Sequence, residues 1–119
     1  MRLRTSNPEL VRVIKFLKRK ANETGSPIWD DVAERLGRSR HGRVCANISR
    51  INRHTAEGET VVVPGKVLGA GVLDHVVHVA AFKFSKLAEE KIKRAKGECL
   101  TISELVDRNV TGAGVKIIG

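Results

Sequence analysis

Apolar residues recur every three or four positions near the start of the chain, and this spacing predicts two amphipathic helices. The first helix begins at Asn7-Pro8, where an N-cap residue precedes a proline, and it ends at Gly25. Ser26-Pro27 begins the second helix, which runs to about Leu36 and stops at Gly37. The face of the first helix that we expect to be buried carries Leu10, Ile14, Leu17 and Ala21.

Short apolar segments alternate with helical ones in the rest of the chain. The segment from Val44 to Ile51 fits a strand by alternation and a helix by spacing, and both stay open. The β-branched segment Thr60–Val63 predicts a strand that stops at Pro64-Gly65, before a glycine-rich turn region at 65–71. The other predicted elements are a strand at Val76–Phe82 buried on both faces, a helix from Ser85 to about Lys96 with Leu87 facing inward, a strand at Cys99–Ile102, a short helix from Thr101 to Asp107 and a strand at Lys116–Ile118. This alternation predicts an α/β part behind a helical N-terminal part.

The chain of 119 residues is long enough for one domain, and its charge is distributed unevenly. It carries 22 Lys and Arg against 13 Asp and Glu, a net charge of +9. Residues 1–54 hold 13 of the cations and 5 of the acids, whereas residues 55–119 hold 9 and 8. We therefore expect a single domain (1–119) that comprises a basic arm (1–6), a basic helical and loop part (7–54) and an α/β part (55–119).

The middle of the chain contains a basic segment without acids. From Arg35 to His54 there are six arginines and two histidines. A solvated surface usually mixes both signs, so a block of one sign indicates a polyanion, either a nucleic acid or an anionic membrane. Nucleic acid is favoured because Gly37 and Gly42 break the segment, which is rich in Arg, Ser and Asn. Four aromatic residues, mostly at core-like positions, favour phosphate contacts over base stacking.

Motifs for catalysis or for cofactor binding are incomplete. Gly69-Ala70-Gly71 lacks the third glycine of a dinucleotide-binding loop, and Gly65-Lys66 lacks the other residues of a P-loop. His75 and His78 would point to opposite faces of a strand, which disfavours a metal site. Cys45 has no evident pocket or orienting partner for work as a nucleophile. We expect no catalysis, no cofactor, no metal and no small-molecule substrate.

Targeting and membrane signals are also lacking. No apolar stretch reaches the roughly 18 residues of a membrane span, so we expect no membrane partner. Residues 1–6 contain no apolar region of the kind that a secretory signal needs. Cys45 and Cys99 form no CxxC motif and have no zinc spacing, so in a reducing cytoplasm we expect them to be small core or surface residues.

A DNA-binding regulator with a helix-turn-helix is the alternative function. The segment Asp31–Ser39 looks like the first helix and turn, with Gly37 in the turn and Ser39 opening the recognition helix. That helix would have to continue past Gly42, where glycine costs about 1 kcal/mol relative to alanine. It would also need an apolar residue at position 43, which is Arg43. These residues disfavour the alternative without removing it.

Five segments together resemble a ribosomal protein family. They read RTSNP at 4–8, NISRI at 47–51, TVVVPGKVLG at 60–69, VAAFKFS at 79–85 and VKIIG at 115–119. In this order they resemble the archaeal and eukaryotic large-subunit ribosomal protein of the eighteen-e type, which is related to bacterial large-subunit protein fifteen. The length is similar to that of the archaeal members. The resemblance implies an α/β fold built as an irregular β-β-α superhelix and a structural, non-catalytic role in the large subunit of the cytoplasmic ribosome. It also implies a basic N-terminal region laid against ribosomal RNA, with other ribosomal proteins as neighbours.

The charge pattern and the resemblance together predict that the part at 7–54 faces RNA. For Arg12 and Lys15, a solvated helix face fits the sequence equally well. The loop at 37–43 favours contact, because its glycines let the backbone approach a phosphate closely. We expect residues 1–6 to be disordered in the free protein. The predicted RNA-binding residues are Arg2, Arg4, Arg12, Lys15, Lys18, Arg19, Lys20, Arg38, Arg40, His41, Arg43, Arg50, Arg53, Lys66 and Lys83.

Overall fold

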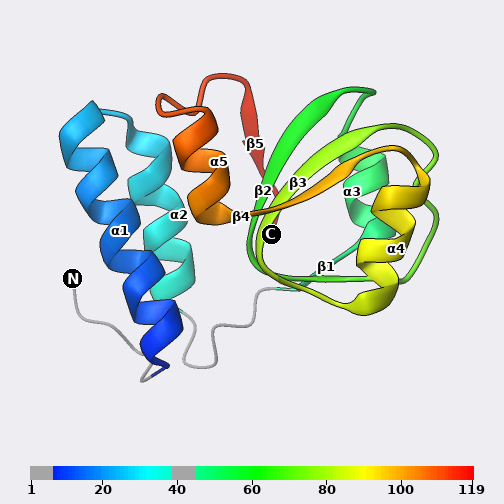
Figure 1. Ribbon diagram of the computed structural model, residues 1–119, viewed down its shortest axis with the longest axis horizontal. Helices are drawn as coiled ribbons and strands as arrows, with labels where there is room; N and C mark the ends of the chain where they lie inside the picture. Colours follow the sequence, from blue (N-terminus) through cyan, green and yellow to red (C-terminus); the bar gives the residue numbers. More distant parts are fainter. Residues whose placement is uncertain (1–6, 39–44) are drawn as a thin grey trace.

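A five-stranded parallel sheet separates two groups of helices (Figure 1). The computed structural model describes residues 7–38 and 45–119. Helices α1, α2 and α5 lie on one side of the sheet, and α3 and α4 lie on the other (Figure 1). The elements in chain order are α1 (Pro8–Thr24), α2 (Pro27–Arg38), β1 (Cys45–Asn47), α3 (Ile48–His54), β2 (Glu59–Leu68), β3 (Val77–Phe84), α4 (Lys86–Arg94), β4 (Glu98–Thr101), α5 (Ile102–Arg108) and β5 (Val115–Ile117).

Strand β2 is the centre of the sheet. Strand β3 pairs along one edge of β2 and is followed by β4. The other edge is shared by two short strands, β5 beside Thr60–Val62 and β1 beside Lys66–Leu68. Because every pair is parallel, the chain must return outside the sheet between strands, through α3, the segment 69–76, α4 and α5. This winding of strands and helices confirms the predicted α/β fold class.

Alternate residues of the central strands are buried in two separate cores. Val62 and Ala80 pack with α1, α2 and α5, whereas Val61, Val63 and Val79 pack with α3 and α4. The prediction that the second strand is buried on both faces is therefore confirmed. Parallel sheets are covered on both faces in this way, and their strands are nearly continuous in apolar residues.

Local signals predicted several helix ends correctly. The side chain of Asn7 accepts a hydrogen bond from the backbone N–H of Glu9, and Gly25 ends α1 with φ +70°. Ser85 caps α4, and Thr101 with Glu104 forms a capping box at the start of α5. These signals act within one helical turn, so they do not depend on the rest of the fold.

Helix α2 does not stop at Gly37, as the sequence predicted, but continues to Arg38. Gly37 is buried within the helix, where packing outweighs the modest helix cost of a glycine. The predicted loop at 37–43 therefore begins in a helix, and its residues 39–43 lie outside the described ranges.

Strand β2 is also longer than predicted, because it continues through Pro64-Gly65 to Leu68. The pairing register with β3 shifts between Val63 and Lys66. A proline is tolerated in a strand at such an irregularity, where the ladder does not need its missing N–H group. The predicted turn region at 65–71 is accordingly wrong over residues 65–68, which are strand.

The segment from Val44 to Ile51, which the sequence left open between strand and helix, is resolved over its described residues. The ambiguous segment ending at Ile51 contains both elements, with strand β1 followed directly by α3. These elements belong to the sheet and its covering layer, although they precede the predicted α/β part at 55–119.

The prediction that Leu87 faces inward is wrong, since its side chain is 50% exposed. It lies over Gly69, where a Cβ atom would meet its side chain.

The backbone of β3 passes close to Gly97, and this contact gives a test of the packing. A Cβ atom at this position would collide with the backbone carbonyl oxygen of Val77, which cannot move without disturbing β3. We expect Gly97→Ala to lower the free energy of unfolding by about 3 kcal/mol in urea denaturation. Gly25→Ala is the control, because a Cβ atom there meets nothing within 4 Å and the cost is only that of the left-handed backbone, about 1 kcal/mol. A smaller loss for Gly97→Ala than for Gly25→Ala would contradict this packing.

Candidate nucleic-acid interface

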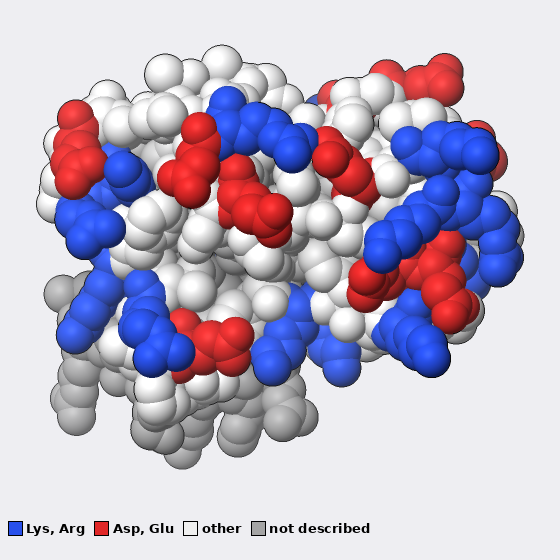
Figure 2. Space-filling model, in the orientation of Figure 1, with Lys and Arg blue, Asp and Glu red and all other residues white. Residues whose placement is uncertain are grey.

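Helix α1 separates an apolar face from a basic one. Leu10, Ile14 and Leu17 are buried against α2 and the sheet, which leaves Arg12 and Lys15 exposed on the outer side. Figure 2 shows Lys and Arg side chains along the α1 side of the molecule, with fewer acidic side chains among them. The helical period thus produces a basic face that does not contribute to the core.

The acids of the N-terminal half are engaged in internal ion pairs. Each of the five acids at 7–54 forms a salt bridge with a described cation. The acids and their partners are Glu9 with Lys83, Glu23 with Arg19 and Lys20, Asp30 and Glu34 with Lys18, and Asp31 with Arg35. Among the described residues of this half, the cations without any salt bridge are Arg12, Lys15, Arg38, Arg50 and Arg53.

Lys18 joins α1 to α2. Its ammonium group lies 2.7 Å from Asp30 Oδ1 and 2.5 Å from Glu34 Oε1. The hydrogen bonds to Asp30 and then to Glu34 raise the pKa of Lys18 above its usual value of 10.5. With its ammonium held by two carboxylates, Lys18 fits a structural role better than the RNA contact that the sequence predicted.

The last turns of α1 hold two cations around an aromatic ring. The Arg19 guanidinium lies 5.7 Å and the Lys20 ammonium 5.8 Å from the centre of the Phe16 ring. Both also pair with Glu23, at 3.7 and 3.4 Å. Phe16 itself is half-buried against the core, so its ring is not a free stacking platform.

A hollow of about 510 Å³ brings together basic residues that are distant in sequence. Arg35 from α2, Arg50 and His54 from α3, and Lys116 from β5 line it. Lys116 donates to the backbone carbonyl of His54 at 3.3 Å and pairs with Glu59 at 3.0 Å. Arg35, His54 and Lys116 were not among the predicted site residues. The pairing of β5 with β2 carries Lys116 to α3, and no local signal in the sequence shows this.

Lys66 and Lys83 lie side by side on the sheet. They are register partners on β2 and β3, and Cys45 of β1 is the next partner along the same row. Lys83 lies 3.9 Å from Glu9 at the start of α1 and 5.7 Å from the centre of the Phe82 ring. Both lysines are exposed. The sheet thus brings two predicted site residues next to the N-terminus of α1.

Arg38 is exposed at the end of α2, and it is the last residue of the first described range. The predicted site residues Arg2, Arg4, Arg40, His41 and Arg43, and the predicted disorder of residues 1–6, lie outside the described residues.

Other chemistry finds little support in the described ranges 7–38 and 45–119. No group of three His, Cys, Asp or Glu residues there could hold a metal ion. Burial raises the pKa of the Cys99 thiol to about 11, so this group stays protonated near neutral pH. The cluster of Glu98, His78 and Arg108 is an ion pair network, in which Arg108 and then His78 lower the pKa of Glu98. None of the helices in these ranges is long and apolar enough to span a membrane.

The described structure argues against the helix-turn-helix alternative. A recognition helix that opened at Ser39 would have to continue through residues 45–47. These residues form strand β1 and pair with β2 in the sheet. Helix α3 begins only at Ile48, and its buried residues Ile48 and Ile51 pack into the core beside the sheet.

The chain is thus a basic α/β protein with a parallel sheet, and within the described ranges one of its faces carries cations without a salt bridge. Comparison with known proteins gives the family. Residues 4–119 match the family described as ribosomal protein 60S L18 and 50S L18e. Three archaeal relatives are each named large ribosomal subunit protein eL18. That of Methanothermobacter thermautotrophicus is 51% identical over 113 residues, which cover 95% of this chain and 93% of the relative. That of Methanosphaerula palustris is 48% identical over 118 residues, with coverage of 98% and 97%. That of Methanospirillum hungatei is 46% identical over 113 residues, with coverage of 95% and 93%.

The chain belongs to this family of ribosomal proteins, and the resemblance found in the sequence is confirmed. It is a structural constituent of the cytoplasmic ribosome, in a family that is not known to be enzymatic.

The position of Lys18 between two helices predicts a stability effect. We expect Lys18→Met to lower the free energy of unfolding by about 1 kcal/mol, because it leaves two carboxylates without their cation. The folded state raises the pKa of Lys18, so this contribution is fully present below pH 10.5 and is lost as the pH rises through the raised pKa. Denaturant unfolding near pH 8 and above pH 11 measures both effects. Lys15→Met is the control and should leave stability unchanged; equal losses for the two variants would argue against this role of Lys18.

Proposed function

We propose that the chain binds and stabilises large-subunit ribosomal RNA through the basic surface of its N-terminal half, the part at 7–54. The observation that carries this proposal is the separation of charges in the described residues. All five acids of this half are used in internal pairs, while Arg12, Lys15, Arg38, Arg50 and Arg53 keep no salt bridge within the described chain. Cations that the fold does not use are available for phosphates.

Contacts to phosphate fit this surface better than contacts to bases. Trp29 is fully buried, and Phe16, Phe82 and Phe84 pack partly against the two cores. The surface therefore lacks exposed aromatic side chains for stacking within the described ranges. The planar guanidinium group of arginine can hold two phosphate oxygens at once, which fits a shape-reading and backbone-reading protein.

The surface extends to predicted residues at its borders. We include Arg19, Lys20, Lys66 and Lys83, whose charges are partly offset by neighbours. The residues outside the described ranges that we expect to join it are Arg2, Arg4, Arg40, His41 and Arg43. The hollow between α2, α3 and β5 adds Arg35, His54 and Lys116. Other proteins of the large subunit are the expected neighbours at its edges.

Charge removal on two helices tests the proposal. We expect Arg12→Ala with Lys15→Ala, and separately Arg50→Ala with Arg53→Ala, to weaken binding of the full chain to purified archaeal large-subunit ribosomal RNA. Plotted as log affinity against log salt concentration, binding should show a slope that is smaller in magnitude by about two units for each double variant. The reason is that each removed cation leaves about one phosphate un-neutralised, and that phosphate keeps its counterions. Filter binding over a salt series measures this slope.

Arg108→Ala is a matched control, because it removes an exposed arginine that is already paired with Glu98. It should change the slope little. If both double variants kept the slope of the unmodified chain, the N-terminal half would not be the RNA-binding surface.

A further inference from the structure

Helix α4 and its flanks form a second basic surface that the sequence analysis left as an ordinary solvated helix. Residues 86–96 hold five cations and two acids. The other six acids of residues 55–119 lie elsewhere on the fold, so the near neutrality of this half conceals a basic end. Figure 2 shows a second gathering of Lys and Arg side chains over α4. The cations are Lys86, Lys91, Lys93, Arg94 and Lys96.

The cations of α4 divide into those that the fold uses and those that it does not. Lys93 pairs with Glu89 at 2.9 Å. Lys91 donates to the carbonyl oxygens of Gly69 and Gly71, each at 2.6 Å. Lys86, Arg94 and Lys96 are exposed and have no salt bridge among the described residues. These three side chains are free to meet an external anion.

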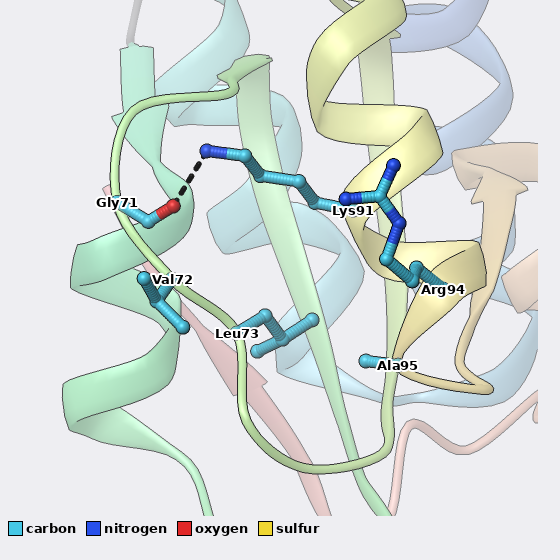
Figure 3. A pocket seen from close by; sticks show the side chains of 6 residues that line it. All are labelled: Gly71, Val72, Leu73, Lys91, Arg94 and Ala95. Carbon is cyan, nitrogen blue, oxygen red and sulfur yellow. Dashed lines mark hydrogen bonds between the residues drawn. The ribbon is translucent and has the colours of Figure 1, made fainter.

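Lys91 also lines a small hollow beside these cations, and Figure 3 shows its bond to Gly71 there. Its volume is about 230 Å³, and Val72, Leu73 and Ala95 give it an apolar lining next to Arg94. Val72 is 70% exposed at its rim. An apolar recess beside a free guanidinium suits a nucleotide, with the base against aliphatic side chains and the phosphate on the cation.

Two of the free lysines occupy positions that the fold alone would not favour. Lys86 is the first residue of α4, where the helix dipole disfavours a positive charge. Lys96 has φ +70°, the conformation that glycine usually supplies after a helix, and it is the non-glycine residue with positive φ in the described chain. The helix dipole explains Arg94 in the last turn of α4 but not Lys86. An external anion beside Lys86 would offset this unfavourable placement.

We infer that α4 and the segment 69–73 form a second RNA-binding surface, so that the protein joins two separate segments of ribosomal RNA. Helices α1 and α4 lie towards opposite ends of the longest dimension, 38 Å (Figure 1). The two basic surfaces are therefore separated along the molecule, and each can contact its own RNA segment. This inference rests on the proposed function and adds a second contact to it. RNA is favoured over an acidic protein because the surface combines three exposed cations without a salt bridge in the described ranges with a partly apolar recess of about 230 Å³.

Directed cleavage from a tethered iron chelate tests this inference by location. The chelate is attached to Glu90→Cys, and separately to Lys15→Cys, in a full chain that carries Cys45→Ser and Cys99→Ala. Each protein is assembled into large subunits. We expect hydroxyl radicals from both positions to cut ribosomal RNA, at two sites that are distant in the RNA sequence. Cuts from position 15 without cuts from position 90 overturn the second surface and leave the proposed function standing. A lack of cuts from position 15 overturns the proposed function itself.

A binding experiment supplies the second, independent readout. The triple variant Lys86→Gln, Arg94→Gln and Lys96→Gly should lower the salt slope for purified large-subunit ribosomal RNA by about two to three units. Glycine is chosen at 96 because it keeps the left-handed backbone. Glu90→Gln removes an acid from the same face and should tighten binding. Thermal unfolding should be the same for the triple variant and the unmodified chain, which shows that the variant folds. If the variant then binds RNA with unchanged affinity, the inference is overturned. That result includes the case in which an acidic ribosomal protein, rather than RNA, covers α4.

Discussion

The enclosure of strand β2 is the constraint on which the rest of the structure depends. Its edges are paired with β3 on one side and with β1 and β5 on the other. Its faces are buried in two cores, as the opposite placement of Val62 and Val63 shows. A strand enclosed in this way has little room for charge, so most of the described cations lie on helices, and Lys66 is the exposed exception on β2. The sheet separates two groups of helices, which carry most of the charged surface of the described chain.

The arrangement of ion pairs decides which of these surfaces are available. Acids of the N-terminal half lie where they can join elements of the fold, as Asp30 and Glu34 do through Lys18. Cations without such a partner then face outward on α1 and α3. Helix α4 shows the same division between cations that the fold binds and cations that it leaves exposed. Lys91 donates to backbone carbonyl oxygens of the segment 69–71, whereas Arg94 has no salt bridge among the described residues. A net charge of +9 is thus organised into surfaces rather than spread over the molecule.

Much of the fold and part of the site could be predicted from the sequence, because some signals are local. Caps such as Asn7 and Ser85 fixed helix starts within a turn, and the helical period placed Arg12 on an outer face. The continuation of β2 past Pro64 could not be predicted, because it depends on a register shift against β3. The hollow that includes Lys116 was missed for a similar reason, since only the sheet brings β5 to α3. The family was recognised from segments spread over the whole chain, which together outweighed the local resemblance to a helix-turn-helix.

The most direct measurement is a cryo-EM reconstruction of the large ribosomal subunit that contains this chain, at a resolution that shows side chains and phosphates. We predict phosphate oxygens at about 3 Å from the guanidinium groups of Arg12, Arg50 and Arg53 and from the ammonium group of Lys15. Those distances would show that cations left unused by the fold are the ones that hold RNA. If these four side chains instead faced solvent or only protein, the basic surface of the N-terminal half would not be the RNA-binding surface.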